Sequence, residues 1–349
     1  MQNMFQVGER QVGDGCPVYV VAEMSANHNQ DYDRAVQIIE AAAEAGADAI
    51  KLQTYRPDTL TIDSDNEPFQ IKEGPWAGRT LYDLYEEAYT PWDWHPELQE
   101  IAHDLGLDFF STPFDASAVE FLEELEVPVY KIASFENVDL PLIRRVAKTG
   151  KPTIMSTGMA TLGEIDEAVR AFREAGGTEL ALLACTSSYP APPEEMHLRR
   201  IPHLAGTFDV VPGLSDHTLG TEAPVAATAL GAQVIEKHLT LSREEEGPDS
   251  DFSLEPSEFA EMVDAVRKTE KAIGEVRYET TEKESESKTF RRSLFMVEDV
   301  NEGERFTEEN VRSIRPGNGL HPRFYEEVIG MSASKEVARG TPLQWEMVS

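Results

Sequence analysis

The sequence predicts an α/β protein whose main part is a TIM (β/α)8 barrel, followed by a small β-rich module. Two observations predict the barrel. Eight short apolar runs alternate with amphipathic helical patterns over roughly 275 residues, which is the size and element count of this fold. Polar side chains also gather at or near the carboxyl end of each run, where barrels of this kind carry their functional groups.

The apolar runs are too short for helices and too continuously apolar for half-exposed strands, so they are expected to be buried parallel strands. The first helical pattern, residues 31–47, places Ala35, Ile38, Ile39 and Ala42 on one face and closes at Gly46. The expected strands span 18–24, 49–55, 108–114, 129–134, 152–158, 180–186, 209–217 and 233–240. The later helical patterns span 94–106, 116–125, 141–150, 162–177, 194–206, 223–231 and 256–274. A doubly wound open sheet is the alternative, but no GxGxxG motif follows the first run.

Three further segments complete the predicted organisation. Residues 56–90 form a long insertion after the second strand, rich in Trp, Tyr and Pro, and are expected to form a wall or lid over a site unless they are only a packed surface flap. The barrel domain is predicted to end at 278. Residues 279–290 have almost no apolar side chains and are expected to be a solvated linker, and 291–349 form the second domain.

Composition excludes several classes of function. The 64 acidic residues outnumber the 31 basic ones and give a net charge of −33, so nucleic acid is not an expected partner. A dispersed acidic surface of this kind favours a high-salt, halophilic cytoplasm over a protein that is merely acidic. No run is long enough to span a membrane, no signal peptide is recognised, and Cys16 and Cys185 form no disulfide framework; these features predict a cytoplasmic protein.

Two histidines end the last two predicted strands. His217 in "GLSDHTLG" and His238 in "IEKHLTL" would lie at the rim of neighbouring strands, close enough to share one divalent cation. With two protein ligands, water or substrate would complete the shell, which suits Mn²⁺ or Mg²⁺ better than a structural zinc. Asp216 and Glu236 are candidate partners for the histidines, and a neighbouring structural charge is the alternative for each. The alternative is that each histidine only makes hydrogen bonds at the rim.

Buried cationic and acidic side chains form the second set of candidates. Lys51 and Lys131 end the second and fourth strands and are expected to hold an anion with phosphate or carboxylate groups, unless they only pair with rim carboxylates. Glu23 and Glu136 are candidate general acids or bases, unless each only holds a lysine in place. Hydroxyl groups at the same rim could donate to the anion: Thr112, Ser134, Ser156, Ser187 and Ser215.

The motifs "AEMSANHN", "AIKLQTY", "FFSTPFD", "KIASFE", "IMSTGMA", "SSYPAPPEE", "GLSDHTLG", "IEKHLTLSR" and "GPDSDFSLEP" together resemble the sialic acid synthase family over nearly the whole chain. The C-terminal module is similar to that family's antifreeze-like SAF domain. Members condense phosphoenolpyruvate with an N-acylated aldose to give a nonulosonic acid and phosphate. "MSANHN" and "SSYPAPPEE" resemble the pseudaminic acid synthases more than the N-acetylneuraminate synthases, which implies 2,4-diacetamido-2,4,6-trideoxy-L-altrose as the sugar.

The resemblance also implies roles for individual residues. His217 and His238 would bind the metal, and Glu136 would lie near the reacting carbons. Arg315 in "RPGNG" would enter the active site of a second subunit, which implies a homodimer with exchanged SAF domains. The phosphoenolpyruvate ligands would be Lys51, Lys131, Thr112, Ser134, Ser156, Ser187 and Ser215, of which the Ser187 position is asparagine in some members. The sugar would be contacted by Glu23, Tyr189 and Asp249, and Gln53 is a further candidate for substrate binding.

Three other interpretations stay open at the level of sequence. N-acetylneuraminate or legionaminic acid synthesis is the alternative within the family. A metal-dependent hydrolase on the same barrel would need a further protein ligand, for which His28 is the candidate near the first strand. A non-catalytic binding protein is the third class, and it predicts that Lys51→Ala and His238→Ala variants function normally.

Overall fold

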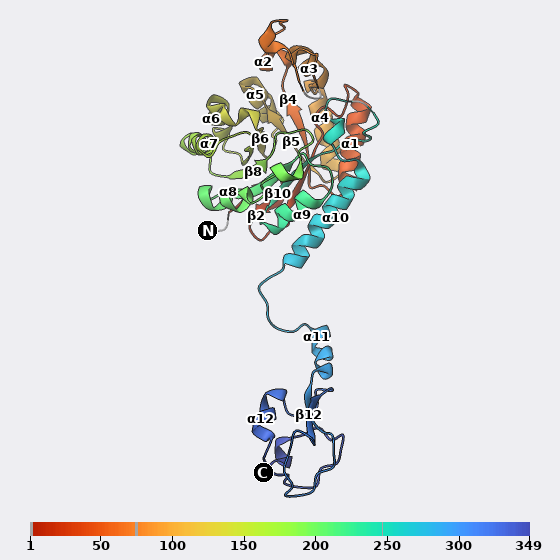
Figure 1. The fold of residues 1–349 in the computed structure, drawn as a ribbon. Coiled ribbons are helices and arrows are strands. Elements are labelled where there is room, and N and C mark those ends of the chain that lie inside the picture. The colour runs from red at the N-terminus through yellow and green to blue at the C-terminus, as the bar shows by residue number, and fades with distance from the viewer. Residues whose placement is uncertain (1–2, 74–75, 246) are drawn as a thin grey trace. The chain divides into compact units, whose positions relative to one another are not determined.

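The computed structural model describes residues 3–73, 76–245 and 247–349. It divides the chain into two compact units, Met1–Gly274 and Glu275–Ser349. The first unit holds a closed barrel of parallel strands in the order β10-β3-β4-β5-β6-β7-β8-β9, with the helices outside the strands (Figure 1). Pairing of β10 with β3 closes the ring. The predicted (β/α)8 barrel is therefore confirmed.

The barrel strands are short and buried, apart from the half-buried Gln53 of β4, as the continuous apolar runs indicate. They are β3 (Tyr19–Glu23), β4 (Ala49–Thr54), β5 (Asp108–Pro113), β6 (Tyr130–Ile132), β7 (Thr153–Ser156), β8 (Leu180–Cys185), β9 (Val211–Asp216) and β10 (Val234–His238). The helices around them are α1 (Tyr32–Glu44), α4 (His95–Asp104), α5 (Ala116–Glu124), α6 (Leu140–Ala147), α7 (Leu162–Glu174), α8 (Arg200–Phe208), α9 (Glu222–Ala229) and α10 (Pro256–Ile273).

Several helices begin at side chains that satisfy the free amide groups of the first turn. Asp31, Asp115 and Asp139 each accept hydrogen bonds from backbone N–H groups at the start of α1, α5 and α6. Thr161 and Glu164 form a reciprocal capping box on α7. These caps fix where each loop from the carboxyl end of a strand enters its helix. Within the described residues, no helix combines the length and apolar character needed to cross a membrane.

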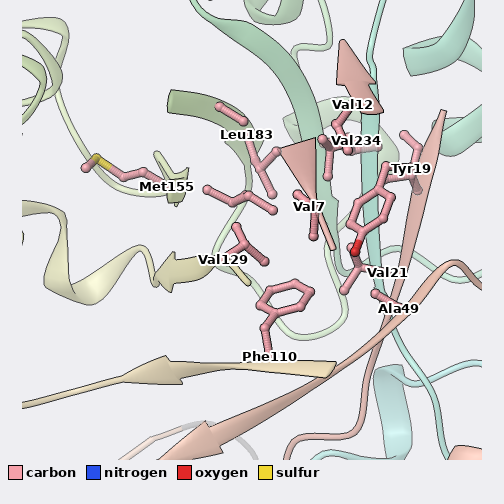
Figure 2. Packing of buried hydrophobic residues seen from close by; sticks show 14 of the residues in the cluster. Val7, Val12, Tyr19, Val21, Ala49, Phe110, Val129, Met155, Leu183 and Val234 are labelled. Atoms are coloured by element: carbon pink, nitrogen blue, oxygen red, sulfur yellow. The ribbon is translucent and has the colours of Figure 1, made fainter. Parts of the chain in front are cut away.

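A β-hairpin that the sequence analysis did not anticipate closes the amino-terminal end of the barrel. It consists of β1 (Met4–Val7) and β2 (Arg10–Gly13). Val7 and Val12 are fully buried and belong to the same apolar cluster as the barrel residues, as Figure 2 shows for Val21, Phe110 and Val234 among others. The valines of the hairpin thus fill the barrel interior at this end.

The insertion of residues 56–90 is helical in part. Its described portion contains α2 (Pro57–Leu60), a 3-10 turn at Glu67–Phe69 and α3 (Leu81–Ala88). Thr80 caps α3 through the backbone amide of Asp83, and Leu84 is the buried residue of that helix. The segment contributes several side chains to the cavity described below.

The second unit has its own small core and paired strands, β11 (Ser293–Met296) and β12 (Val311–Ile314), with a short helix α12 (Tyr325–Val328). The segment expected to be a linker, 279–290, is almost entirely exposed, yet it contains α11 (Glu282–Ser287). A capping box between Thr281 and Glu284 explains how a sequence without apolar residues forms this helical turn. The division between the units falls four residues before the predicted end of the barrel domain.

Candidate active site

A cavity of about 520 Å³ opens at the carboxyl end of the barrel strands. Its wall combines the predicted polar side chains of the barrel with apolar side chains of the 56–90 insertion. The predicted site residues in the wall are Glu23, Lys51, Gln53, Thr112, Lys131, Ser134, Glu136, Ser156, Tyr189, Ser215, His217, His238 and Asp249. The structure therefore brings together side chains from all eight strands or the loops that follow them.

Strand alternation decides which side chains face this cavity. Successive residues of a strand point to opposite faces, so Glu236 and His238 point inward while Lys237 points outward. On the neighbouring strand and its end, Ser215 and His217 point inward and Asp216 outward. The inward residues of both strands line the cavity, which is the arrangement that the two-residue spacing in each motif predicts.

Lys51 lies at the centre of the polar end of the cavity. Its Nζ atom is 2.6 Å from Glu23 Oε2, 3.7 Å from Glu236 Oε2, and donates a hydrogen bond of 3.2 Å to Thr112 Oγ1. Burial alone would lower the pKa of Lys51, but the two carboxylates raise it above its ordinary value. The ammonium group is therefore kept charged at the base of the site.

Lys131 lies on the other side of the same carboxylate. Its Nζ atom donates hydrogen bonds to Ser156 Oγ at 2.7 Å and to the Ile132 carbonyl at 3.0 Å, and lies 3.8 Å from Glu236 Oε1. Burial lowers the pKa of Lys131, and Glu236 opposes that shift. A second anion in the cavity would stabilise the charged form further.

Glu236 is the residue whose position the sequence analysis misjudged. It was considered a partner for His238, but it points at the two lysines and accepts a hydrogen bond of 3.1 Å from Ser215 Oγ. Burial raises the pKa of Glu236, whereas Lys131 and Lys51 lower it more, so the net shift is downward. Burial raises the pKa of Glu23. Glu236 is two residues before His238 on β10, so the alternation of side chains along the strand could have predicted that it points into the cavity.

The two candidate metal ligands are neighbours, with ring centroids 5.3 Å apart. His217 Nδ1 lies 2.9 Å from the Thr186 carbonyl, an arrangement in which Nδ1–H donates and Nε2 is left to bind another group. His238 Nδ1 is buried without a hydrogen-bond partner among the described residues. Burial and the nearby cations lower the pKa of His238 well below its usual range, whereas the burial of His217 is outweighed by Cys185 and the Thr186 carbonyl, which raise its pKa. Metal binding requires the neutral form of both rings.

These observations fit a divalent cation held by two imidazoles. Within the described ranges, no group of three or more His, Cys, Asp and Glu side chains is arranged to hold a metal ion. A cation at His217 and His238 would therefore need oxygen atoms from water or substrate, which the adjacent cavity can admit. His28, the further ligand that a hydrolase would need, does not line the cavity beside His217 and His238. It is buried elsewhere, with Nε2 3.1 Å from Thr90 Oγ1, and burial lowers its pKa to about 4.

Asp216 was the other proposed partner of a histidine, and the structure places it on the outer face of β9. Its Oδ2 atom lies 2.5 Å from Lys237 Nζ, and both side chains are fully buried. The one-residue offset from His217 turns its carboxylate away from the imidazole. The orienting contact of His217 is instead the carbonyl of Thr186.

Carboxylates also line the part of the cavity formed by the predicted sugar-contacting residues. Gln53 Nε2 donates to Glu23 Oε1 at 3.1 Å and to Ser25 Oγ at 2.8 Å, and Ser25 in turn donates to Asp249. Burial raises the pKa of Asp249. Burial also raises the pKa of Glu136 to about 7, although Lys131 opposes the shift. Glu136 is therefore suited to hold or release a proton near neutral pH.

Two predicted site residues are not in the cavity wall. Ser187 lies just beside it, with its hydroxyl 3.9 Å from Cys185 Sγ. Gly158 faces the hydroxyls of Ser187 and Ser134, and a Cβ atom there would lie 2.3 and 2.7 Å from them, so glycine is required for this close approach. Arg315 belongs to the second unit, where it is exposed after β12.

Apart from Tyr189, the sequence analysis did not name the aromatic residues of the wall. Trp76, from the insertion, has its ring centroid 5.9 Å from that of Tyr189, and its indole N–H donates to the Pro248 carbonyl. Tyr189 also packs on His217 at 4.6 Å and on Phe252 at 4.9 Å. The richness of residues 56–90 in Trp and Tyr was the available signal, but nothing in the sequence showed which rings meet the barrel.

Taken together, the fold and the site define a TIM-barrel protein with a deep cavity at its carboxyl end, lined by buried ammonium, carboxylate and imidazole groups. The chain belongs to the NeuB family, whose model matches residues 38–278, and residues 291–349 match the SAF domain. The resemblance found from the motifs is thereby confirmed.

Known relatives match almost the full chain. It is 49% identical to the pseudaminic acid synthase of Campylobacter jejuni, over 94% of this chain and 95% of that protein. It is 37% identical to the N,N'-diacetyllegionaminic acid synthase of the same organism, over 90% and 96%. The solved structure of N-acetylneuraminic acid synthetase from Leptospira borgpetersenii, in complex with citrate, matches with a TM-score of 0.73 and 32% identity, over 82% of this chain and 95% of that one.

Proposed function

We propose that the protein condenses phosphoenolpyruvate with 2,4-diacetamido-2,4,6-trideoxy-L-altrose and water to give pseudaminic acid and phosphate. The observation that carries this proposal is the placement of Lys51 and Lys131 on either side of Glu236, next to the histidine pair in one cavity. Two ammonium groups suit the phosphate and carboxylate of phosphoenolpyruvate. The higher identity to the pseudaminic acid synthase than to the legionaminic acid synthase supports the choice of sugar.

The residues of the chain bind, orient and supply protons in this reaction. Lys51, Lys131 and the hydroxyls of Thr112, Ser156 and Ser215 would hold the two anionic groups, so that C3 of phosphoenolpyruvate faces the aldehyde carbon of the sugar. A C–C bond forms between these carbons, water adds at C2, and phosphate leaves by cleavage of its C–O bond. Glu136, with its pKa near 7, lies in the wall where a proton must be moved.

We also propose that His217 and His238 hold Mn²⁺ or Mg²⁺. Such a cation would polarise the aldehyde oxygen as a Lewis acid when it is bound. His217→Ala is expected to abolish metal-dependent turnover, whereas the exposed His203→Ala serves as the matched histidine control and leaves it unchanged. Restoration of turnover by Mn²⁺ after chelation is the accompanying measurement. A His217→Ala enzyme that keeps full, metal-dependent turnover would refute this ligand assignment.

The decisive experiment measures phosphate release from phosphoenolpyruvate with a panel of acylated aldoses and identifies each product by mass spectrometry. We expect release that depends on the sugar and is fastest with the 2,4-diacetamido-altrose. Faster turnover of N-acetylmannosamine or of the legionaminic acid precursor would transfer the assignment to the alternative within the family. Absence of sugar-dependent release with every aldose would reject the synthase function.

A homodimer with exchanged SAF domains is part of the same proposal. Arg315 is exposed on the second unit, and the barrel unit exposes Phe135, Val138, Met159 and Leu162 on segments that follow β6 and β7. An exposed apolar group of this kind is typical of an interaction surface. Mixing Arg315→Ala with Lys51→Met subunits is expected to restore activity if each active site uses both chains.

The cytoplasmic location and the halophilic habitat, inferred from composition, stay predictions.

A further inference from the structure

A buried ion pair lies directly behind the two candidate metal ligands. Lys237 and Asp216 are paired residues of neighbouring strands in the barrel register, and their side chains point outward, away from the cavity. Lys237 immediately precedes His238, and Asp216 immediately precedes His217. The pair is therefore one residue away from both imidazoles while contacting neither of them.

The contacts of the pair also include the residue that follows His217. Lys237 Nζ lies 2.5 Å from Asp216 Oδ2 and donates to the Thr218 carbonyl, with Thr218 Oγ1 at 3.4 Å. Asp216 accepts the Thr218 amide at 2.9 Å and the Thr218 hydroxyl at 3.1 Å. The three side chains, which we call the clasp, hold the backbone on both sides of His217 against the residue before His238.

The clasp is not explained by stability alone. Both charged side chains have zero exposure, and a buried ion pair gains little or nothing over apolar residues of the same volume because both charges must leave water. Burial lowers the pKa of Lys237, and Asp216 opposes that shift. What the clasp does provide is geometry, since every donor of the ammonium group has a fixed acceptor.

His238 is the imidazole that depends on such support. His217 has the Thr186 carbonyl to orient its ring, whereas Nδ1 of His238 is buried without a hydrogen-bond partner in the described parts of the chain. The ring of His238 is positioned by its backbone and by packing against Phe252, at a centroid distance of 5.0 Å. The position of its backbone relative to β9 is what the clasp fixes.

We propose that Asp216, Lys237 and Thr218 are positioning residues that set the separation of His217 and His238 for metal binding. This inference rests on the proposed metal site. It predicts that loss of the clasp weakens metal affinity without removing either ligand, by roughly 10- to 100-fold, the usual effect of removing a support behind a metal ligand.

The test compares Mn²⁺ affinity in the absence of substrates, measured by the electron paramagnetic resonance signal of free Mn²⁺, with thermal stability of the same samples. The double variant Asp216→Asn/Lys237→Met removes both charges together. We expect Mn²⁺ to bind 10- to 100-fold more weakly, and turnover to return to within about twofold of wild type once Mn²⁺ is saturating. A purely structural role would lower the melting temperature and leave the Mn²⁺ affinity of the folded protein unchanged.

The matched control is Asp48→Asn/Arg267→Met, which removes a partly buried ion pair of 2.7 Å near the start of β4. It is expected to change stability but not Mn²⁺ affinity. If the double clasp variant does not fold, Thr218→Val removes one hydroxyl from the clasp and is expected to weaken Mn²⁺ binding by a few-fold. Folded clasp variants that bind Mn²⁺ as tightly as wild type overturn the inference, whereas a wild-type protein that binds no Mn²⁺ overturns the metal site itself.

Discussion

The two ends of the barrel use similar residues for different purposes. At the amino-terminal end, Asp108 accepts a hydrogen bond of 2.9 Å from the Tyr19 hydroxyl and pairs with Arg10 at 3.2 Å. At the carboxyl end, Lys51 and Lys131 share Glu236 at 3.7 and 3.8 Å. The first set is closed off by the β1–β2 hairpin, whereas the second faces a cavity of about 520 Å³.

The difference teaches how a barrel separates stability from chemistry. Ion pairs at the closed end have protein partners only, so their value lies in holding strands and hairpin together. The ammonium groups at the open end keep donor capacity for a ligand. Each has three donors and makes two close polar contacts, while Glu236 lies 3.7 and 3.8 Å away, beyond hydrogen-bond distance. Polar groups at the carboxyl end of barrel strands are therefore expected to affect activity, and those at the other end to affect stability.

The largest effect is expected for Lys131→Met. Removal of this buried ammonium group takes away a charged donor to the anion, and turnover should fall by roughly 10²- to 10³-fold, as for loss of one preorganised donor in an active site. The assay is sugar-dependent phosphate release. Arg10→Met at the closed end is the control, since its partly exposed pair should contribute no more than about 1 kcal/mol to stability and nothing to turnover. Equal losses of turnover in both variants would contradict the separation.

The Glu136→Gln variant tests the comparison of the two barrel ends through the pH dependence of stability. Glu136 Oε2 is buried without a hydrogen-bond partner among the described residues, whereas Asp108 has two partners. Burial raises the pKa of Glu136 to about 7, above the value of a free glutamate. Between these two pKa values the folded state holds a proton that the unfolded state releases, so this group makes the protein less stable as pH rises from about 4.5 to 7.

The measurement is the free energy of unfolding of wild type and Glu136→Gln at several pH values. The wild type should lose up to about 1.4 kcal/mol per pH unit relative to the variant across this window, because one proton is linked to folding. Above pH 7 the difference should become constant. A difference that stays flat from pH 5 to 7 would mean that the carboxyl is ionised like an exposed one, and Glu136 would lose its candidacy as the proton carrier.

The sequence predicted most of the fold and most of the residues that line the cavity, but not all of their contacts. Continuous apolar runs identified the strands because both faces of a barrel strand are buried, and the position of polar residues at strand ends placed Lys51, Lys131, His217 and His238 at one opening. Which side of a strand a residue faces follows from alternation relative to the inward histidines, and Asp216 and Glu236 were both considered partners of the histidines from their adjacency in sequence alone. One points outward and the other points at the lysines.

Other features depend on contacts between distant segments, which no local pattern encodes. The hairpin of residues 4–13 was missed because its strands are four residues long and its two inward valines meet the barrel core only after folding. The meeting of Trp76 with Tyr189 joins the insertion to a loop more than a hundred residues away. In both cases the sequence showed apolar or aromatic residues but not their partners.

The smallest effect on activity is expected at the hairpin, with Val12→Ala. Val12 is fully buried in the barrel cluster (Figure 2), so loss of two methyl groups should cost about 2 kcal/mol of stability, from reduced apolar burial and the cavity left behind. Chemical denaturation measures this change, and Val276→Ala is the matched control because Val276 is 91% exposed. Turnover per folded molecule should be unchanged, since the hairpin and the cavity lie at opposite ends of the strands. A Val12→Ala protein of normal stability but reduced turnover would show that the closed end is coupled to the open one. The conclusion that one end serves stability and the other serves activity would then be wrong.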